Sequence, residues 1–157
     1  KYRPPAVNSA QAGFAADGKM SAVKLHLVAP SITARWAPAV VKDIVDPFAV
    51  EAAHNFPYGV PNVYVDYLQH EIGIDVGYWR SVSHALNCYA VESFIDECAA
   101  SANMDPYEFR RSMLNEQPRW QAVLERHIRP LPGRGPDGGA RKGPSVRAHR
   151  RRSWWCG

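Results

Sequence analysis

The chain has 157 residues and a mass of 17.5 kDa, which is the length of one domain. An apolar content of 46% and a charged content of 22% exclude a chain that is disordered throughout. No apolar run approaches the ~20 residues of a membrane-spanning helix. Three cysteines without a Cys-x-x-Cys pair exclude a dense disulfide framework and give no support to a zinc site.

Charge is distributed unevenly along the chain. Residues 1–128 hold 11 Lys/Arg and 14 Asp/Glu, whereas residues 129–157 hold eight basic residues, one acid, six Gly and four Pro. A segment of that composition cannot bury enough apolar surface to offset the entropy of ordering it. We therefore predict a domain over 1–128 and a disordered Arg/Gly/Pro-rich tail over 129–157. A chain cut after Arg129 is expected to keep its melting temperature.

The first two predicted elements form a hairpin. Apolar-rich runs cover Val7–Phe14 and Met20–Val28, and Asp17-Gly18 lies between them. Asp-Gly is a strong hairpin signal because glycine accepts the positive φ of a tight turn. In the second run apolar and polar residues alternate, which predicts a strand with one buried and one wet face.

An irregular stretch follows, and then a further strand. Residues 29–60 contain four prolines as breaks, and the apolar pair Val40-Val41 is interpreted as part of one or two helical turns. Apolar and polar residues alternate over 62–70, which predicts a strong strand. The segment Val76–Trp79 is a short additional strand candidate.

A long amphipathic helix is predicted from Ala85 to Ala100, because apolar residues recur there at spacings of three and four. Glu92 and Asp96 lie one turn apart on its wetter side. Paired carboxylates can share a proton or hold a metal. We interpret this pair instead as a solvated acidic face.

Two shorter helices complete the domain. Asp105-Pro106 has the pattern of an N-cap followed by a first-turn proline, which predicts a helix from Pro106 to about Leu114. A third helix is predicted from Pro118 to His127. Strands that precede helices indicate an α+β fold, with antiparallel strands followed by two or three helices on one face of the sheet.

The candidate site is the segment 77–84, at the junction between a short strand and the long helix. The backbone N–H groups at a helix start are free, and anions bind to them readily. Arg80 adds a donor fork that is always charged. This pattern favours a site for a phosphate, a carboxylate or an oxo-anion. The alternative is structural: Tyr78 and Trp79 are core aromatics, and Arg80 pairs with a nearby acid.

The basic tail allows three interpretations. Its arginines can contact phosphate and Trp154-Trp155 can stack on bases, which would make the chain a non-catalytic binding module for nucleic acid or another polyanion. It can also be an extension without function. Its Arg/Gly/Pro bias is, thirdly, typical of a high-GC gene translated out of frame. No Ser-His-Asp signature, phosphate-binding glycine loop or paired-His zinc motif is present.

Four motifs follow one another in a specific order along the chain. They are Val60-Pro61-Asn62-Val63, Gly77-Tyr78-Trp79-Arg80-Ser81-Val82, Val91-Glu92-Ser93-Phe94-Ile95-Asp96-Glu97 and Asp105-Pro106-Tyr107-Glu108-Phe109-Arg110-Arg111. This series resembles the large, molybdopterin-binding subunit of molybdenum hydroxylases. It is most similar to the isoquinoline 1-oxidoreductase beta-subunit type, related to aldehyde oxidase and xanthine dehydrogenase, and the resemblance covers about residues 1–127.

The resemblance implies cofactor-binding roles for Arg80, Ser81 and Val82. In the family a loop of the form Phe-Arg-Gly-Phe-Gly-Gly-Pro-Gln lies beside the molybdenum, and Arg80 matches its arginine. Ser81 replaces the following glycine, as in the isoquinoline type, and Val82 replaces a phenylalanine that stacks on substrate in xanthine-oxidising members. Ser83 and Leu86 replace a glycine and the glutamine. We expect the loop to line a concave surface, with Tyr78 or Trp79 packed behind it and Phe94 and Ile95 fixing it from below.

The resemblance also implies that the chain is an internal fragment of a longer subunit. The family's Gly-Gly-Phe-Gly segment and its catalytic glutamate have no counterpart here, so no catalytic residue and no metal ligand is assigned. The implied activity is oxidation of N-heteroaromatic compounds or aldehydes, with water as the oxygen source. The implied cofactor is molybdopterin, in the cytosine dinucleotide form, and the implied partner is a small subunit that carries iron–sulfur clusters. The compartment stays open.

Overall fold

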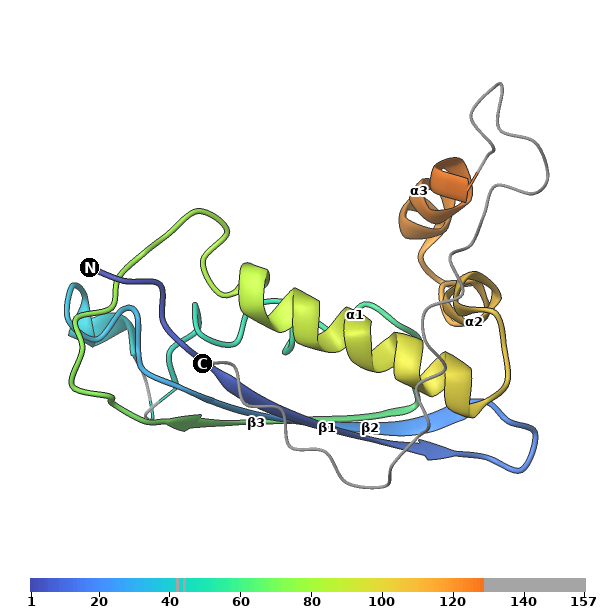
Figure 1. Cartoon of the computed structure of the whole chain (residues 1–157), viewed down its shortest axis with the longest axis horizontal. Coiled ribbons are helices and arrows are strands. Elements are labelled where there is room, and N and C mark those ends of the chain that lie inside the picture. The colour runs from blue at the N-terminus through green and yellow to red at the C-terminus, as the bar shows by residue number, and fades with distance from the viewer. Residues whose placement is uncertain (42, 44, 129–157) are drawn as a thin grey trace.

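The computed structural model describes residues 1–41, 43 and 45–128, so the predicted tail over 129–157 lies outside the described residues. Three strands precede three α-helices (Figure 1), which confirms the α+β class. The elements in chain order are β1 (Val7–Phe14), β2 (Met20–Ala29), the 3₁₀ helix η1 (Pro38–Val40), β3 (Asn62–Gln69), α1 (His84–Ser101), α2 (Pro106–Ser112) and α3 (Pro118–Ile128).

The predicted hairpin is confirmed. Strands β1 and β2 pair antiparallel, with Ser9 opposite His26. Gly18 adopts a φ of 81°, in the left-handed region that a tight turn requires. The Asp17 side chain accepts a hydrogen bond from the Lys19 N–H at 3.1 Å, so the aspartate also stabilises the turn.

The prediction that the whole sheet is antiparallel is wrong. The strand order is β1-β2-β3, and β3 pairs with β2 in parallel, from Ala22 opposite Asn62 to Ala29 opposite Gln69. Parallel neighbours need a crossover connection of a dozen residues or more, whereas antiparallel neighbours can be joined by a hairpin. The irregular stretch 30–61 is that crossover.

The strand predicted over Val76–Trp79 is also wrong. Val76 forms only an isolated bridge with Tyr2, supported by hydrogen bonds from Tyr2 N to Asp75 O (3.0 Å) and from Gly77 N to Tyr2 O (3.2 Å). The partner segment continues into Pro4-Pro5, and proline has no N–H with which to extend a ladder.

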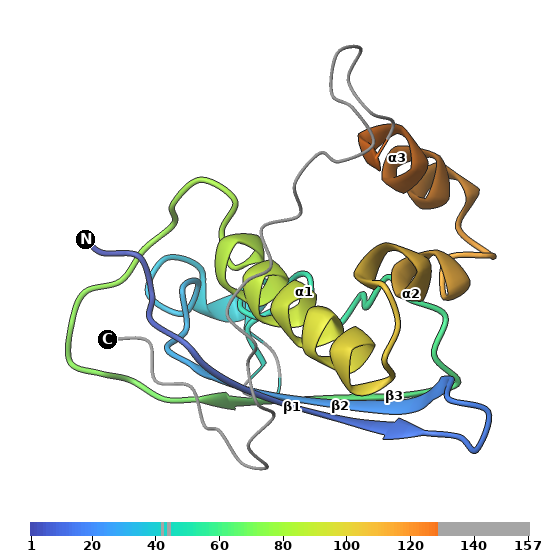
Figure 2. The ribbon, with the colours of Figure 1, turned by 45° about the vertical axis from the view of Figure 1, so that its right-hand side comes forward.

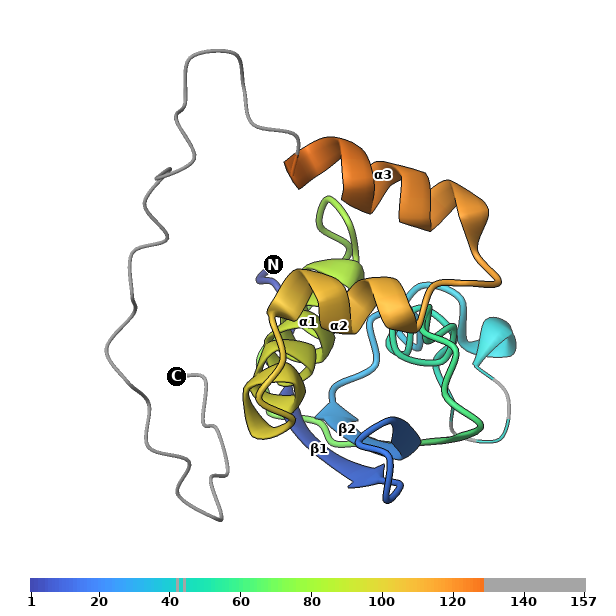
Figure 3. The same cartoon turned by 90° about the vertical axis from the view of Figure 1, so that its right-hand side faces the viewer.

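The helices lie on one side of the sheet (Figures 1 and 2). α1 crosses the sheet, and α2 and α3 stack progressively farther from it, as the end-on view in Figure 3 also shows. Alternate residues of β2 point toward α1 and are buried, and one face of α1 meets them. The main core contains Val23, Leu25 and Leu27 of β2, Val91, Ile95, Cys98 and Ala99 of α1, and Phe109 of α2. Burial of each such large side chain contributes roughly 1.5–3 kcal/mol.

The second helix begins at its predicted cap. The Asp105 carboxylate accepts hydrogen bonds from the N–H groups of Tyr107 (2.9 Å) and Glu108 (3.2 Å), which satisfies two free donors of the first turn. α2 ends at Ser112, two residues before the predicted end, and the buried Leu114 lies in the turn beyond it. α3 begins at Pro118 as predicted.

Candidate functional site

The segment that leads into α1 has an unusual backbone. Ser81 and Val82 adopt φ values of 69° and 46°, in the left-handed region. For an L-residue that conformation is costly, and for a β-branched residue such as valine it is a true outlier. Ser81 and Val82, two of the three residues predicted to bind the cofactor, nevertheless adopt this conformation one after the other. Strained backbone of this kind concentrates at functional sites.

Few hydrogen bonds stabilise this loop from within. Val82 N donates to Trp79 O at 2.9 Å, and His84 N donates to Ser81 O at 2.9 Å. The Ser81 hydroxyl donates to Arg80 O at 2.6 Å. Among the described residues, the N–H groups of Arg80 and Ser81 have no acceptor. The loop therefore presents two consecutive backbone donors just before the helix.

The structural alternative for this loop is wrong. Tyr78 is 46% exposed and Trp79 is 57% exposed, so neither is a core aromatic. Arg80 is exposed as well and forms no ion pair with any residue that the structure describes. Its guanidinium is therefore free to meet an external anion.

Tyr78 anchors the loop on its N-terminal side. Its hydroxyl lies 2.8 Å from Thr33 Oγ1, and its ring packs edge-on against Phe48 with centroids 5.7 Å apart. Tyr78 therefore provides the support behind the loop that the sequence predicted of Tyr78 or Trp79. Trp79 turns the other way, with the Arg3 guanidinium 5.8 Å from its ring centroid.

Thr33 and Phe48 are held in turn by Asp46, whose side chain is fully buried. Its carboxylate accepts hydrogen bonds from Ser31 Oγ (2.8 Å), Thr33 N (2.8 Å), Thr33 Oγ1 (2.9 Å) and Phe48 N (2.9 Å). Burial alone would raise the pKa of Asp46, but the hydrogen bonds from Thr33, Ser31 and Phe48 outweigh it and hold the pKa below its usual value. Sequence reasoning missed Asp46, because nothing local in the irregular stretch distinguishes it.

The helix end of the loop is tied to the same irregular stretch. The buried Asn87 donates from Nδ2 to Ala49 O at 2.9 Å and to Glu51 O at 2.8 Å. His84 Nδ1 lies 3.2 Å from Glu51 Oε2. These contacts, together with Tyr78, fix both ends of the strained turn.

Phe94 and Ile95 do not support the loop in the predicted way. Ile95 is fully buried in the main core, and Phe94 packs against that core. At 1.5 Å per helical residue, Ile95 lies roughly 18 Å along the helix from Ser83. They anchor α1 on the sheet rather than contacting the loop.

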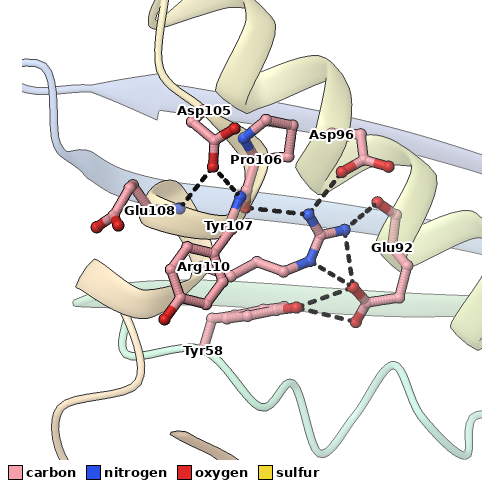
Figure 4. Close-up of polar contacts among 8 residues, drawn as sticks. All are labelled: Tyr58, Glu92, Asp96, Asp105, Pro106, Tyr107, Glu108 and Arg110. Atoms are coloured by element: carbon pink, nitrogen blue, oxygen red, sulfur yellow. Dashed lines mark hydrogen bonds and ion pairs between the residues drawn. The ribbon is translucent and has the colours of Figure 1, made fainter. Parts of the chain in front are cut away.

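The predicted solvated acidic face of α1 is in fact a docking point for α2 (Figure 4). Arg110 donates from Nε to Glu92 Oε2 at 3.0 Å and from Nη1 to Asp96 Oδ1 at 2.5 Å, and its Nη2 forms an ion pair with Glu92 Oε2 at 3.0 Å. Tyr58 OH donates to Glu92 Oε2 at 2.9 Å. Burial would lower the pKa of Arg110, but Asp96 and Glu92 raise it well above its usual value. This network gives a structural role to the acidic motif on α1, through Glu92 and Asp96, and to the arginine motif on α2, through Arg110.

Two open hollows lie elsewhere, on the sheet. One of about 550 Å³ is lined by residues of all three strands, and one of about 290 Å³ is lined by Ser9, Gln11, Lys24, His26 and Asp66. His26 Nδ1 lies 2.6 Å from Asp66 Oδ2 there. Arg80 lines neither hollow, so the concave surface around it stays a prediction. Over residues 1–41, 43 and 45–128, no three His, Cys, Asp or Glu side chains gather closely enough to hold a metal ion, and no helix has the length and apolarity to cross a membrane.

Comparison with known proteins agrees with the motif resemblance. A stretch of 67 residues is 39% identical to isoquinoline 1-oxidoreductase subunit beta of Brevundimonas diminuta. That stretch covers 43% of this chain and 9% of the relative, so the match spans only a small part of the relative's length. Residues 1–114 match the family described as the molybdopterin cofactor-binding domain, and this match covers β1 to α2 and the whole candidate loop. The chain belongs to the family of molybdopterin cofactor-binding domains.

Proposed function

We propose that residues 1–128 are part of the large subunit of a molybdenum-dependent oxidoreductase, in which Arg80, Ser81 and Val82 contact the cofactor. The carrying observation is the left-handed backbone of Ser81 and Val82, directly after an exposed Arg80 that forms no ion pair within residues 1–41, 43 and 45–128. Strain of this kind persists only where the surroundings impose it, as Tyr78 and Asn87 do here.

The donors of the loop fit an anionic cofactor. Molybdopterin carries a phosphate and several hydrogen-bond acceptors, and the loop offers the free N–H groups of Arg80 and Ser81 together with the Arg80 guanidinium. Hydrogen bonds from a charged donor contribute about 1.5–3 kcal/mol each. The loop precedes α1, so the positive end of the helix dipole adds to the attraction.

When bound, the cofactor would supply the two-electron oxidation of a substrate carbon, with water as the source of oxygen. The residues of this chain would hold and orient it. Arg80 would offset negative charge at the pocket wall, and the turn at Ser81 would hold its backbone donors in a fixed position. We assign no general base within the chain.

The name of the Brevundimonas protein specifies an N-heteroaromatic compound and a beta subunit. On that basis we propose hydroxylation of N-heteroaromatic compounds. From the family resemblance we further propose oxidation of aldehydes as the alternative reaction, the cytosine dinucleotide form of the cofactor, and transfer of electrons to a small iron–sulfur subunit. The alternative of a polyanion-binding module depends on the tail, which lies outside the described residues.

The test is cofactor content and turnover of the complete large subunit purified with its partner. We expect about one molybdenum per large subunit by elemental analysis, cytidine monophosphate after acid hydrolysis, and reduction of an artificial electron acceptor with isoquinoline or an aldehyde. A folded complex without molybdenum after expression in a host that makes the cofactor would reject the proposal. Release of another nucleotide would reject only the cytosine form.

A further inference from the structure

We propose that Asp46 is a positioning residue for the Arg80–Val82 loop and acts through Thr33 and Tyr78. The consequence for turnover depends on the function proposed above, whereas the mechanical link depends only on contacts within the described residues. Asp46 precedes Arg80 by 34 positions, so no local pattern connects them.

Asp46 is the centre of a buried polar cluster. No part of it is exposed, and four hydrogen bonds of 2.8–2.9 Å converge on its two carboxylate oxygens from Ser31, Thr33 and Phe48. A buried carboxylate with this many donors has one low-energy geometry, because loss of any donor leaves buried charge unsatisfied. The cluster is therefore a rigid support.

The direction of the chain of hydrogen bonds follows from the number of protons. An ionised carboxylate only accepts, so the single hydroxyl proton of Thr33 points to Asp46 Oδ1 at 2.9 Å. Thr33 Oγ1 then has only lone pairs to offer, and Tyr78 OH donates to it at 2.8 Å. Hydrogen bonds are therefore donated from Tyr78 to Thr33 and from Thr33 to Asp46, and the series ends on a charged carboxylate.

Two independent contacts of Tyr78 trace back to the same carboxylate oxygen. Asp46 Oδ1 accepts from Thr33 Oγ1, which receives the Tyr78 hydroxyl, and from Phe48 N, whose residue packs its ring edge-on against the Tyr78 ring. Asp46 thus fixes Tyr78 both by its polar tip and by its ring. Tyr78 is three residues before Ser81.

The loop needs such support because its own hydrogen bonds are few. Val82 N and His84 N are bound within the turn, at 2.9 Å to Trp79 O and Ser81 O. Residues other than glycine keep a left-handed backbone conformation only where contacts of the neighbouring residues impose it. Tyr78 supplies those contacts on the N-terminal side of the turn, so loss of its hydrogen bond is expected to make the turn open more often.

The test is amide hydrogen exchange on the 157-residue chain, with Val82 and His84 as reporters of the turn. Tyr78→Phe removes the hydroxyl and keeps the ring, and Thr33→Val removes the relay with little change in volume. We expect exchange at both reporters to accelerate by about fivefold to tenfold in Tyr78→Phe, the effect of one lost hydrogen bond on local opening, and by at least as much in Thr33→Val, which loses two. Thr33→Ser keeps the hydroxyl and is expected to restore wild-type rates.

The matched control is Tyr58→Phe, which removes a tyrosine hydroxyl bond of 2.9 Å to Glu92 in the middle of α1, outside the Asp46 cluster. It should leave the exchange of Val82 and His84 unchanged. Wild-type exchange in Tyr78→Phe and Thr33→Val would overturn the inference, and so would equal acceleration in Tyr58→Phe, because the effect would then be global.

A second measurement separates this inference from the proposed function. In the complete subunit, Tyr78→Phe is expected to lower kcat several-fold at equal molybdenum content, with Thr33→Ser near wild type. If Arg80→Ala has no effect on turnover, the proposed function of the loop fails while the exchange result stands. If Arg80→Ala lowers turnover and Tyr78→Phe does not, the positioning role for catalysis is rejected.

Discussion

Arg110 of α2 holds the carboxylate of Glu92 of α1 by a hydrogen bond from Nε to Oε2 and by an ion-pair contact between a terminal nitrogen and the same oxygen, both at 3.0 Å. The same guanidinium reaches Asp96 and also donates to Glu92 O. Only 14% of the Arg110 side chain is accessible, which limits solvent screening. This one residue joins the second helix to the first, and the two helices with the sheet form the body that supports the candidate loop.

Arg110→Ala is expected to destabilise the chain by about 1–2 kcal/mol, because it leaves two carboxylates without their charged partner, although the Glu92 and Asp96 side chains are 37% and 58% accessible to solvent. Urea unfolding followed by circular dichroism measures the change. The control is Arg111→Ala, which removes an arginine whose side chain is 48% accessible and should cost under about 0.5 kcal/mol. Equal effects of the two variants would contradict the role given to Arg110.

Ser81→Gly is expected to stabilise the chain by about 0.5 kcal/mol. Glycine relieves the left-handed strain, which is worth about 1 kcal/mol, and part of that gain is lost to the greater entropy of the unfolded chain. Ser93→Gly, in the interior of α1, should instead destabilise by roughly 0.5–1 kcal/mol. Thermal unfolding of both variants shows whether each change stabilises or destabilises the chain. A destabilised Ser81→Gly would show that the turn is not strained.

The stability of the chain is expected to fall in acid partly because of Asp46. Its pKa is lower in the folded chain than the ordinary value of 3.8, so its contribution is complete above about pH 5 and is lost as pH falls through the folded pKa. Asp46→Asn removes that contribution. The difference in unfolding free energy between wild type and variant should therefore be constant from about pH 7 to 5 and shrink below about pH 4.

The control for that titration is Glu116→Gln, which neutralises an exposed acid. Its unfolding free energy should follow that of wild type across the range. A difference between wild type and Asp46→Asn that grows on acidification would reverse the sign and contradict the account of the Asp46 cluster.

The 157-residue chain by itself is expected to show no hydroxylase activity. The family's catalytic glutamate and its first cofactor segment have no counterpart in the sequence. Steady-state assays with isoquinoline, quinoline and an aldehyde, on chain expressed in a host that makes the cofactor, provide the measurement. Turnover by this chain above a heat-treated control would refute the expectation.

Local signals in the sequence predicted the elements well. Asp17-Gly18 fixed the hairpin, and Asp105-Pro106 fixed the start of α2, because turn and cap chemistry act over a few residues. The family resemblance placed the loop at Arg80–Val82, and Ser81 and Val82 prove to be strained. Serine and valine themselves give no sign of a positive φ, because residues of these types rarely adopt it.

What the sequence did not show is long-range. The parallel pairing of β3 with β2 depends on how the 30–61 crossover returns to the sheet, and periodicity within β3 is the same in either direction. The pairing of Arg110 with Glu92 spans 18 residues, and the Tyr78–Thr33 contact spans 45. A buried carboxylate such as Asp46 is also indistinguishable in sequence from a solvated one.

Kinetics on Arg80→Ala in the complete subunit decide whether Arg80 lies at the wall of a cofactor pocket, as we propose. With molybdenum content held equal to wild type, kcat is expected to fall about tenfold or more, from the loss of one charged contact of ~1.5–3 kcal/mol. The control is Arg111→Ala on α2, which should keep the wild-type rate. An unchanged kcat in Arg80→Ala would contradict the account and leave Arg80 as an exposed surface residue.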